Sequence, residues 1–167
     1  MPPSRIEKPY HVGRCSIVDP TAVIADTVWI GSYVTIRPLA VIGDNTEIRN
    51  YCFIAEGAVI GSNSRIFQFS NIGAWCVVES SVFIGPRVLL LNDRKLDYLR
   101  RDFVPSPVII KYGARIAGGA VILPGVTIGV NAVIGAGAVV TRNIPDFMTA
   151  WGNPAQITRR VPEDENI

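Results

Sequence analysis

The side chains best suited to chemistry gather in one short, charged stretch, residues 91–103. Asn92 and Asp93 lie near its start. A carboxylate can accept a proton or orient a nucleophile, whereas a carboxamide can orient a substrate or polarise a carbonyl. Arg94 and Lys95 follow, and their cations pair with phosphates or carboxylates. Because seven of the chain's 30 formal side-chain charges lie in this stretch, we expect it to form a binding surface.

Tyr98 lies in the same stretch, and we expect it to contact a substrate together with Arg94 and Lys95. Arg100 and Arg101 add two further cations that could meet a phosphate-bearing ligand. The alternative interpretation is a solvated loop that only holds subunits together. No histidine accompanies these groups, since the single histidine, His11, lies far upstream.

A six-residue repeat surrounds this stretch and must position it. A large aliphatic residue occupies every sixth position in two series: Val18, Ile24, Ile30, Ile36, Ile42, Ile48, Ile54, Ile60, Ile66, Ile72, Val78, Ile84, Leu90, and then Ile110, Ile116, Ile122, Ile128, Ile134, Val140. The series are 20 residues apart, which is three hexads plus two, so an insertion interrupts the repeat. The nineteen positions predict about six coils of three hexads each.

Each hexad reads as a short strand followed by a corner. A smaller residue stands two positions before most of the large ones, which is the alternation of a strand with two inward side chains. Glycine, aspartate or asparagine often follows, and these residues bend a chain at low steric cost. A helix is excluded because six residues rotate the side chain by about 240° net, which would smear the column around the axis. The pattern predicts an all-β parallel solenoid.

Composition excludes several other classes of protein. The net charge of +2 and the absence of a dense basic block argue against a nucleic-acid partner. No apolar run approaches the roughly 18 residues of a membrane span, and residues 1–9 contain no apolar signal-peptide core. Cys15, Cys52 and Cys76 have no CxxC spacing, which fits reduced thiols and a cytoplasmic location. Cys52 and Cys76 fall on the small inward position, so we expect them to be packed.

The hexads and three further motifs give the chain a family resemblance. The motifs are residues 125–129 (GVTIG), residues 134–141 (IGAGAVVT) and residues 152–155 (GNPA). Across residues 17–161 the chain resembles the hexapeptide-repeat acyltransferases, most of all their nucleotide-sugar N-acetyltransferases. The resemblance implies a left-handed parallel β-helix, a homotrimer, and active sites between neighbouring subunits.

The expected organisation has three parts. Residues 1–16 form an N-terminal lead-in, residues 17–142 the β-helix with the excursion 91–109, and residues 143–167 a C-terminal segment that covers its end.

The resemblance also implies acetyl-CoA as the acyl donor, with no metal. The donor contacts that the motifs carry over are Gly118, Ala136, Thr141, Arg142 and Arg159. The glycine and the alanine would allow close backbone approach, and the arginines would meet the phosphates of coenzyme A. The chain departs from the family pattern at one place, since many relatives carry Lys or Arg where it has Gln156; Arg160 could compensate.

The acceptor that the resemblance implies is an amino sugar, nucleotide-linked, in surface-polysaccharide biosynthesis. An alcohol acceptor needs a general base, and other family members carry a catalytic histidine in the excursion that is missing here. We therefore expect N-acetylation, with Asn92 and Asp93 as catalytic residues. O-acetylation of a sugar or small molecule and a non-enzymatic scaffold remain the alternatives. The zinc-dependent carbonic anhydrases of this fold are excluded, since one histidine cannot supply three ligands.

Overall fold

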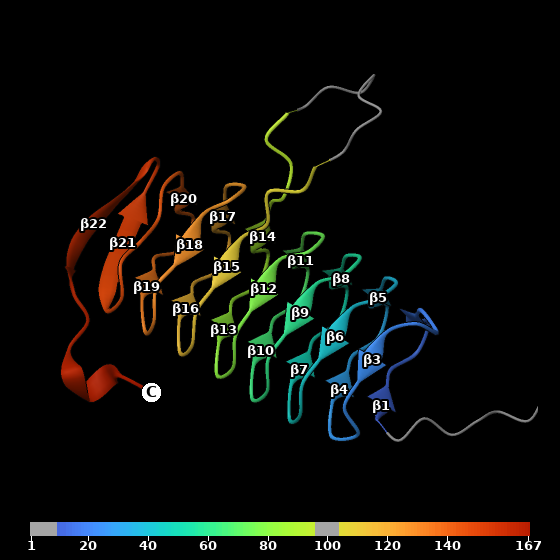
Figure 1. Cartoon of the computed structure of the whole chain (residues 1–167). Helices are drawn as coiled ribbons and strands as arrows, with labels where there is room; N and C mark the ends of the chain where they lie inside the picture. The colour runs from blue at the N-terminus through green and yellow to red at the C-terminus, as the bar shows by residue number, and fades with distance from the viewer. Residues whose placement is uncertain (1–9, 96–103) are drawn as a thin grey trace, which may run out of the picture.

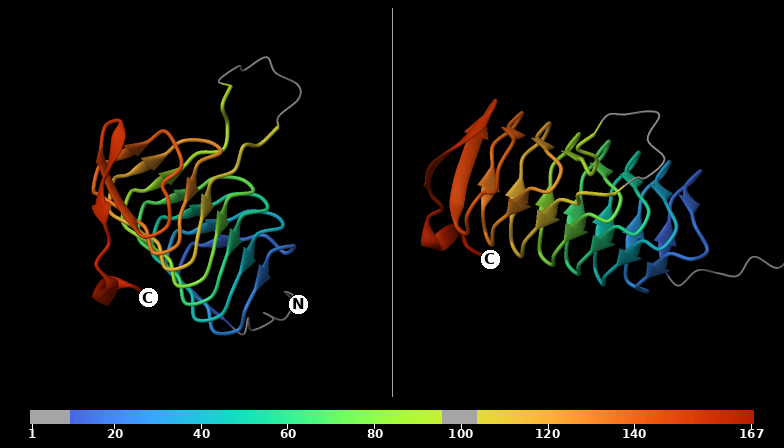
Figure 2. Two further views of the ribbon diagram at one scale, coloured as in Figure 1. Left: turned by 60° about the vertical axis from the view of Figure 1, so that its left-hand side comes forward. Right: turned by 45° about the horizontal axis from the view of Figure 1, so that its top comes forward.

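A computed structural model describes residues 10–95 and 104–167. These residues form a column of coils stacked along one axis, with the longest strands at the C-terminal end (Figures 1 and 2). Each complete coil contributes one two-residue strand to each of three parallel sheets, named here sheets A, B and C. This architecture confirms the predicted left-handed parallel β-helix.

From β1 to β20, the strands of each sheet follow one another every third strand along the chain. Sheet A contains β1 (His11–Val12), β4 (Trp29–Ile30), β7 (Glu47–Ile48), β10 (Arg65–Ile66), β13 (Phe83–Ile84), β16 (Arg115–Ile116), β19 (Val133–Ile134), β21 (Met148–Gly152) and β22 (Ala155–Arg160). Sheet B contains β2 (Ile17–Val18), β5 (Thr35–Ile36), β8 (Phe53–Ile54), β11 (Asn71–Ile72), β14 (Leu89–Leu90), β17 (Val121–Ile122) and β20 (Val139–Val140). Sheet C contains β3 (Val23–Ile24), β6 (Val41–Ile42), β9 (Val59–Ile60), β12 (Val77–Val78), β15 (Ile109–Ile110) and β18 (Thr127–Ile128).

The sixth-position residues form the core because every strand pairs with the equivalent strand of the next coil. Ile48, for example, lies beside Ile30 on one side and Ile66 on the other. The second residue of each strand from β4 to β20 points inward and is buried. Burying each such side chain contributes about 1.5–3 kcal/mol, which offsets the ordering of a chain without a two-layer core.

Polar residues at the small inward position link successive coils. The Ser70 hydroxyl donates to the Gly85 carbonyl at 2.8 Å and accepts from the Val88 N–H at 3.1 Å. Ser64 does the same with the Glu79 carbonyl and the Val82 N–H. These buried hydroxyls are therefore fully paired, as a buried polar group must be to avoid a desolvation cost.

The two ends of the column differ. At the N-terminal end, β1 begins at His11, so regular pairing starts within the segment expected to be a lead-in. The inward residues Val12, Val18 and Ile24 of this first coil are only partly buried. At the other end, β21 pairs with β19 and then antiparallel with β22, which covers the last coil. A short 3₁₀ helix, η1 (Glu163–Glu165), follows.

The sheets meet at three corners, named AB, BC and CA after the sheets that they join. One residue in most corners has a left-handed backbone, including non-glycine residues such as Tyr51 (φ 61°) and Asn63 (φ 58°). Such a conformation costs about 1–2 kcal/mol for an L-residue outside glycine, so the stacked coils must impose it. The corners are thus rigid, and their outward side chains stand in columns along the axis.

The cysteines provide a test of this core. Cys52 and Cys76 are buried and Cys15 is exposed. Burial raises the pKa of both the Cys52 and the Cys76 thiol to about 11. We expect a thiol reagent at pH 8 to modify one cysteine per native chain and three in denaturant.

The raised thiol pKa values also predict a pH dependence of stability. The unfolded thiols ionise from about pH 9, whereas the folded ones stay neutral. Their contribution to stability is complete below pH 9 and is lost as the pH rises towards 11. Rapid labelling of two or more cysteines in the native state would contradict this arrangement.

Candidate active site

The charged excursion leaves the column at corner BC, directly after β14. Asn92 keeps contact with the column: its carbonyl accepts the Ser106 N–H at 2.7 Å, and its side chain lies over Gly73 in the coil before. A Cβ at Gly73 would come within 3.2 Å of the Asn92 carboxamide, so glycine there leaves room for it. Asp93 is half-buried, and its carboxylate accepts the Lys95 N–H at 2.9 Å.

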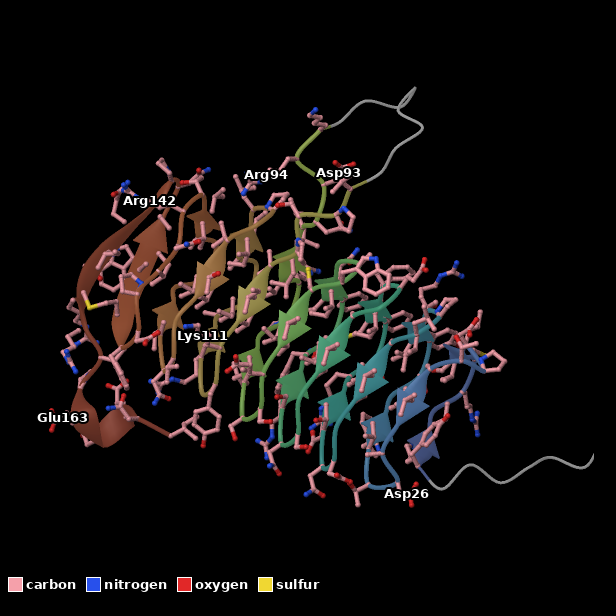
Figure 3. The ribbon with its side chains drawn as sticks, in the orientation of Figure 1. Asp26, Asp93, Arg94, Lys111, Arg142 and Glu163 are labelled. Carbon is pink, nitrogen blue, oxygen red and sulfur yellow. The ribbon has the colours of Figure 1, made fainter. Side chains whose placement is uncertain are left out.

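Arg94 is held against the next coil. Its Nε donates to the Pro124 carbonyl at 3.3 Å, and its guanidinium occupies the space where a side chain on Gly125 would lie. Ser106, on the segment that returns from the excursion to β15, accepts the Gly125 N–H through its carbonyl at 2.8 Å. The base of the excursion is therefore fixed to the column, and Asp93 and Arg94 lie along one edge of it (Figure 3). Lys95 is exposed beside them.

Thr141 and Arg142 lie on the same corner, BC, at the end of β20. Both are exposed, and Figure 3 shows Arg142 along the same edge of the column as Arg94 and Asp93. The Arg142 guanidinium donates to the Gln156 side chain on β22. Gln156, the departure from the family pattern, thus orients a neighbouring cation.

Gly118 and Ala136 lie on corner AB, on the other side of sheet B. They stack in successive coils, since the Gly137 N–H donates to the Gly118 carbonyl at 3.0 Å. The structure therefore divides the predicted donor contacts between two corners of the chain.

Corner AB changes character along the column. The same left-handed position holds Tyr33, Tyr51, Phe69 and Arg87 in the earlier coils, and Gly119 and Gly137 in the last two. Neither glycine is required by the backbone, because the other coils accept side chains at nearly the same φ.

Nor is either glycine required by packing. A Cβ at Gly137 would meet nothing within 4 Å, and one at Gly119 nothing closer than 3.8 Å. The two glycines leave an open strip of backbone, named here the glycine corner together with Gly118 and Ala136.

The cations of β22 lie at the C-terminal end of sheet A. Arg159 is exposed and pairs with Thr149 across the hairpin. Arg160 packs its guanidinium over the Phe147 ring at 5.4 Å. Arg159 is thus the more available cation of the two.

Tyr98, Arg100 and Arg101 lie outside the described residues. Among residues 10–95 and 104–167, no group of three His, Cys, Asp or Glu side chains is arranged to hold a metal ion. No helix in the same residues is long and apolar enough to cross a membrane.

The structure adds one feature that the hexad pattern did not single out. Tyr33, Tyr51 and Phe69 stack face to face along corner AB, with ring centroids 4.9 and 5.0 Å apart. Their recurrence every 18 residues is visible in the sequence, because one coil comprises three hexads. We call these three residues the aromatic ladder.

Comparison with known proteins agrees with this fold. Residues 21–56 match the family described as bacterial transferase hexapeptide (six repeats). A hexapeptide-repeat containing acetyltransferase of Vibrio cholerae, solved with acetyl coenzyme A, superposes with a TM-score of 0.54 and 27% identity, covering 92% of this chain and 72% of that one.

Two curated enzymes illustrate the range of acceptors among the relatives. A galactoside O-acetyltransferase of Lactococcus lactis is 29% identical over 106 residues, 58% of this chain and 51% of that protein. A dTDP-3-amino-3,6-dideoxy-alpha-D-galactopyranose 3-N-acetyltransferase of Aneurinibacillus thermoaerophilus is 55% identical over 49 residues, 29% of this chain and 26% of that protein.

In its fold and in these matches, the chain is similar to the transferases built on a hexapeptide β-helix. Residues 21–56 match that family's repeat, and over 92% of its length the chain is similar in fold to one of its acetyltransferases. It spans about half the length of the first curated relatives that it matches.

Proposed function

We propose that the chain is an acetyl-CoA-dependent acetyltransferase that acts on an amine of a sugar, in the synthesis of a surface polysaccharide in the cytoplasm. The observation that carries the proposal is the glycine corner. Bulky side chains occupy this corner in the earlier coils, and glycines replace them in the last two. Neither the backbone conformation nor the packing requires glycine there. An extended, amide-bearing chain such as pantetheine can lie close to backbone only where side chains are absent.

The phosphates of the donor would be met by arginines at the same end of the column. Arg142 is oriented by Gln156, and Arg159 is exposed on β22. Guanidinium groups suit phosphates because they present several donors in a fixed plane.

The separation of the predicted contacts supports a site shared between subunits. Gly118 and Ala136 lie on corner AB, whereas Asn92 and Thr141 lie on corner BC. A second copy that brings its corner BC against corner AB of the first would complete the site. We therefore propose a homotrimer, in which each chain supplies two different surfaces, as a cyclic assembly requires.

The acetyl transfer needs few groups. The neutral amine attacks the thioester carbonyl, the new C–N bond forms, the C–S bond breaks, and the amine proton passes to the leaving thiolate. Asp93 would carry that proton, and Asn92 would orient the carbonyl. The half-burial of both side chains against a rigid coil suits them to positioning.

An amine acceptor is favoured over an alcohol by the residues at corner BC. Among the described residues, the only histidine is His11, stacked on Trp29 at the opposite end of the column. The 55% identical segment shared with an amino-sugar N-acetyltransferase supports the same assignment. O-acetylation is the second candidate, supported by the galactoside O-acetyltransferase.

The experiment that tests the proposal has two parts. Titration calorimetry with acetyl-CoA and with free coenzyme A should show one site per chain, weakened in Arg142→Gln. A panel of amino sugars, nucleotide-linked amino sugars and neutral sugars is then scored for amide or ester products. Ester products alone would assign the second candidate, and a folded protein that binds no coenzyme A would refute both.

The proposed trimer needs a surface on which the subunits contact one another, and we expect sheet C to provide it. The outward residues of sheet C carry no charge along its whole length: Val23, Val41, Val59, Val77, Ile109 and Thr127. We expect Val59→Glu to shift the protein from trimer to monomer in analytical ultracentrifugation, because a carboxylate would be desolvated at the contact. Arg65→Glu places the same charge on sheet A, whose outward residues already include Glu47 and Arg115, as a control. A trimer unaffected by Val59→Glu would exclude sheet C as a contact.

A further inference from the structure

A groove of about 310 Å³ lies on corner AB in the first half of the column. It is lined by Trp29, Arg49, Asn50, Tyr51, Gln68 and Phe69, named here the ladder groove. Tyr51 and Phe69 of the ladder line it together with Trp29 and Arg49, and the carboxamides of Asn50 and Gln68 complete the lining. The volume is in the range that small-molecule sites occupy.

The aromatic wall presents ring edges. Tyr51 is covered on its two faces by Tyr33 and Phe69, at interplanar angles of 1° and 5°. The edge of an aromatic ring is positive and its face is negative, so edge-to-face contact is favourable between rings. A planar ligand whose face lies against the ladder would make this contact with two rings at once. A saturated sugar ring has no such face to offer.

The carboxamides provide donors of fixed direction. The Asn50 Oδ1 accepts the Ser32 N–H at 2.9 Å, which leaves the Asn50 NH₂ group without a partner among the described residues. Gly31 makes this possible, because a Cβ there would collide with the Asn50 side chain. The Gln68 side chain has no hydrogen-bond partner in the described part of the chain and can both donate and accept.

Two arginines frame the groove. Arg49 lies 5.1 Å from the Trp29 ring and 5.7 Å from the Phe67 ring, and it pairs with Glu47 at 2.5 Å. Its Nε is buried without a hydrogen-bond partner. Arg87 stacks over Phe69 at 5.9 Å and has no carboxylate partner among the described residues. Arg87 stands one coil from the groove and one coil from Gly119.

Along corner AB, the ladder groove therefore comes first, Arg87 follows one coil later, and the glycine corner begins one coil after Arg87. We propose that the ladder groove binds the nucleobase of a nucleoside diphosphate-linked acceptor, with Arg87 at its diphosphate. The carbohydrate end of such a molecule then points along the column towards the glycine corner. This assignment rests on the proposed function, which places the acyl donor at that corner.

The carboxamides favour one kind of base. The Asn50 NH₂ group requires an acceptor, and Gln68 can pair with an adjacent N–H and C=O. Uracil, thymine and guanine offer a carbonyl beside a ring N–H, whereas adenine does not. The groove should therefore prefer UDP, dTDP or GDP over ADP. The same preference should make it a poor site for coenzyme A, whose base is adenine.

The test measures binding of UDP, dTDP, GDP and ADP to the full chain by calorimetry, with no acyl donor present. We expect one site per chain for at least one of the first three, and at least about tenfold weaker binding of ADP. Arg87→Gln should weaken binding about 10- to 100-fold, as for loss of a charged hydrogen bond, and Gln68→Ala about 5- to 10-fold. Arg65→Gln, an exposed arginine on sheet A, is the matched control and should change binding less than twofold.

The outcomes separate the two proposals. Coenzyme A binding without nucleotide binding overturns the groove assignment alone. Nucleotide binding without coenzyme A binding sustains the groove and overturns the donor site. Nucleotide binding that is insensitive to Arg87→Gln but lost in Arg142→Gln would place the nucleotide at the donor site and overturn the groove assignment.

Discussion

Replacement of Gly137 by tyrosine is expected to weaken coenzyme A binding at least about 100-fold. The phenol would stand on the open strip of corner AB, where the structure leaves no other atom within 4 Å of a Cβ. The fold should tolerate it, because Tyr33 and Tyr51 already occupy this corner position at φ 59° and 61°. The left-handed backbone costs the new side chain about 1–2 kcal/mol. Calorimetry with free coenzyme A and thermal unfolding measure the two effects separately.

Gly137→Ala is the matched control for this substitution. It carries the same backbone strain without the bulk, so it should bind coenzyme A within about threefold of the parent protein. If tyrosine and alanine bound coenzyme A equally well, the donor would not lie along the glycine corner, and Thr141 and Arg142 on corner BC would become the main candidates.

The second large effect concerns the core. Ile66→Ala should lower the free energy of unfolding by about 3 kcal/mol and the melting temperature by about 6–12 °C. Ile66 is fully buried between Ile48 and Ile84. Hydrogen bonds between coils fix their spacing, so the column cannot collapse around the cavity. Urea denaturation of the two proteins measures the difference.

The neighbouring residue supplies the control. Arg65 precedes Ile66 in the same strand but points outward and has no ion-pair partner among the described residues. Arg65→Ala should change stability by less than about 0.5 kcal/mol. Comparable losses for both substitutions would mean that the strand does not alternate as the structure has it.

The fold could be predicted because its signal is repeated at every coil. A single Ile says little, but nineteen aliphatic residues in phase exclude a helix and require a coil of equal faces. The number of coils was slightly underestimated, because the described residues form twenty two-residue strands, one of them at His11–Val12, where the hexad pattern is weak. The inward positions of Cys52 and Cys76 followed from the same register, and their burial is confirmed.

The site could be predicted only in part, because corners obey weaker rules than strands. The hexad identifies which residues turn, but not which of three corners each turn occupies. The placement of Gly118 and Thr141 on different corners becomes visible only when successive strands are assigned in turn to the three sheets. Similarly, Tyr33, Tyr51 and Phe69 are unremarkable as outward residues of a six-residue repeat, and they become a ladder only at a period of 18. The link from Arg142 to Gln156 depends on the β21–β22 hairpin, which follows no repeat.

The unequal ends of the column give unfolding a direction. Each coil touches only its neighbours, so opening must begin at an end and proceed coil by coil. The C-terminal end is closed by β21 and β22, whereas the first coil leaves Val12, Val18 and Ile24 partly exposed. Amide protons should therefore exchange fastest near His11 and progressively more slowly towards the middle coils. A force applied to the N-terminal end would therefore unfold the coils one after another from that end. The glycine corner, which lies in the last coils, would keep its structure until late in this process.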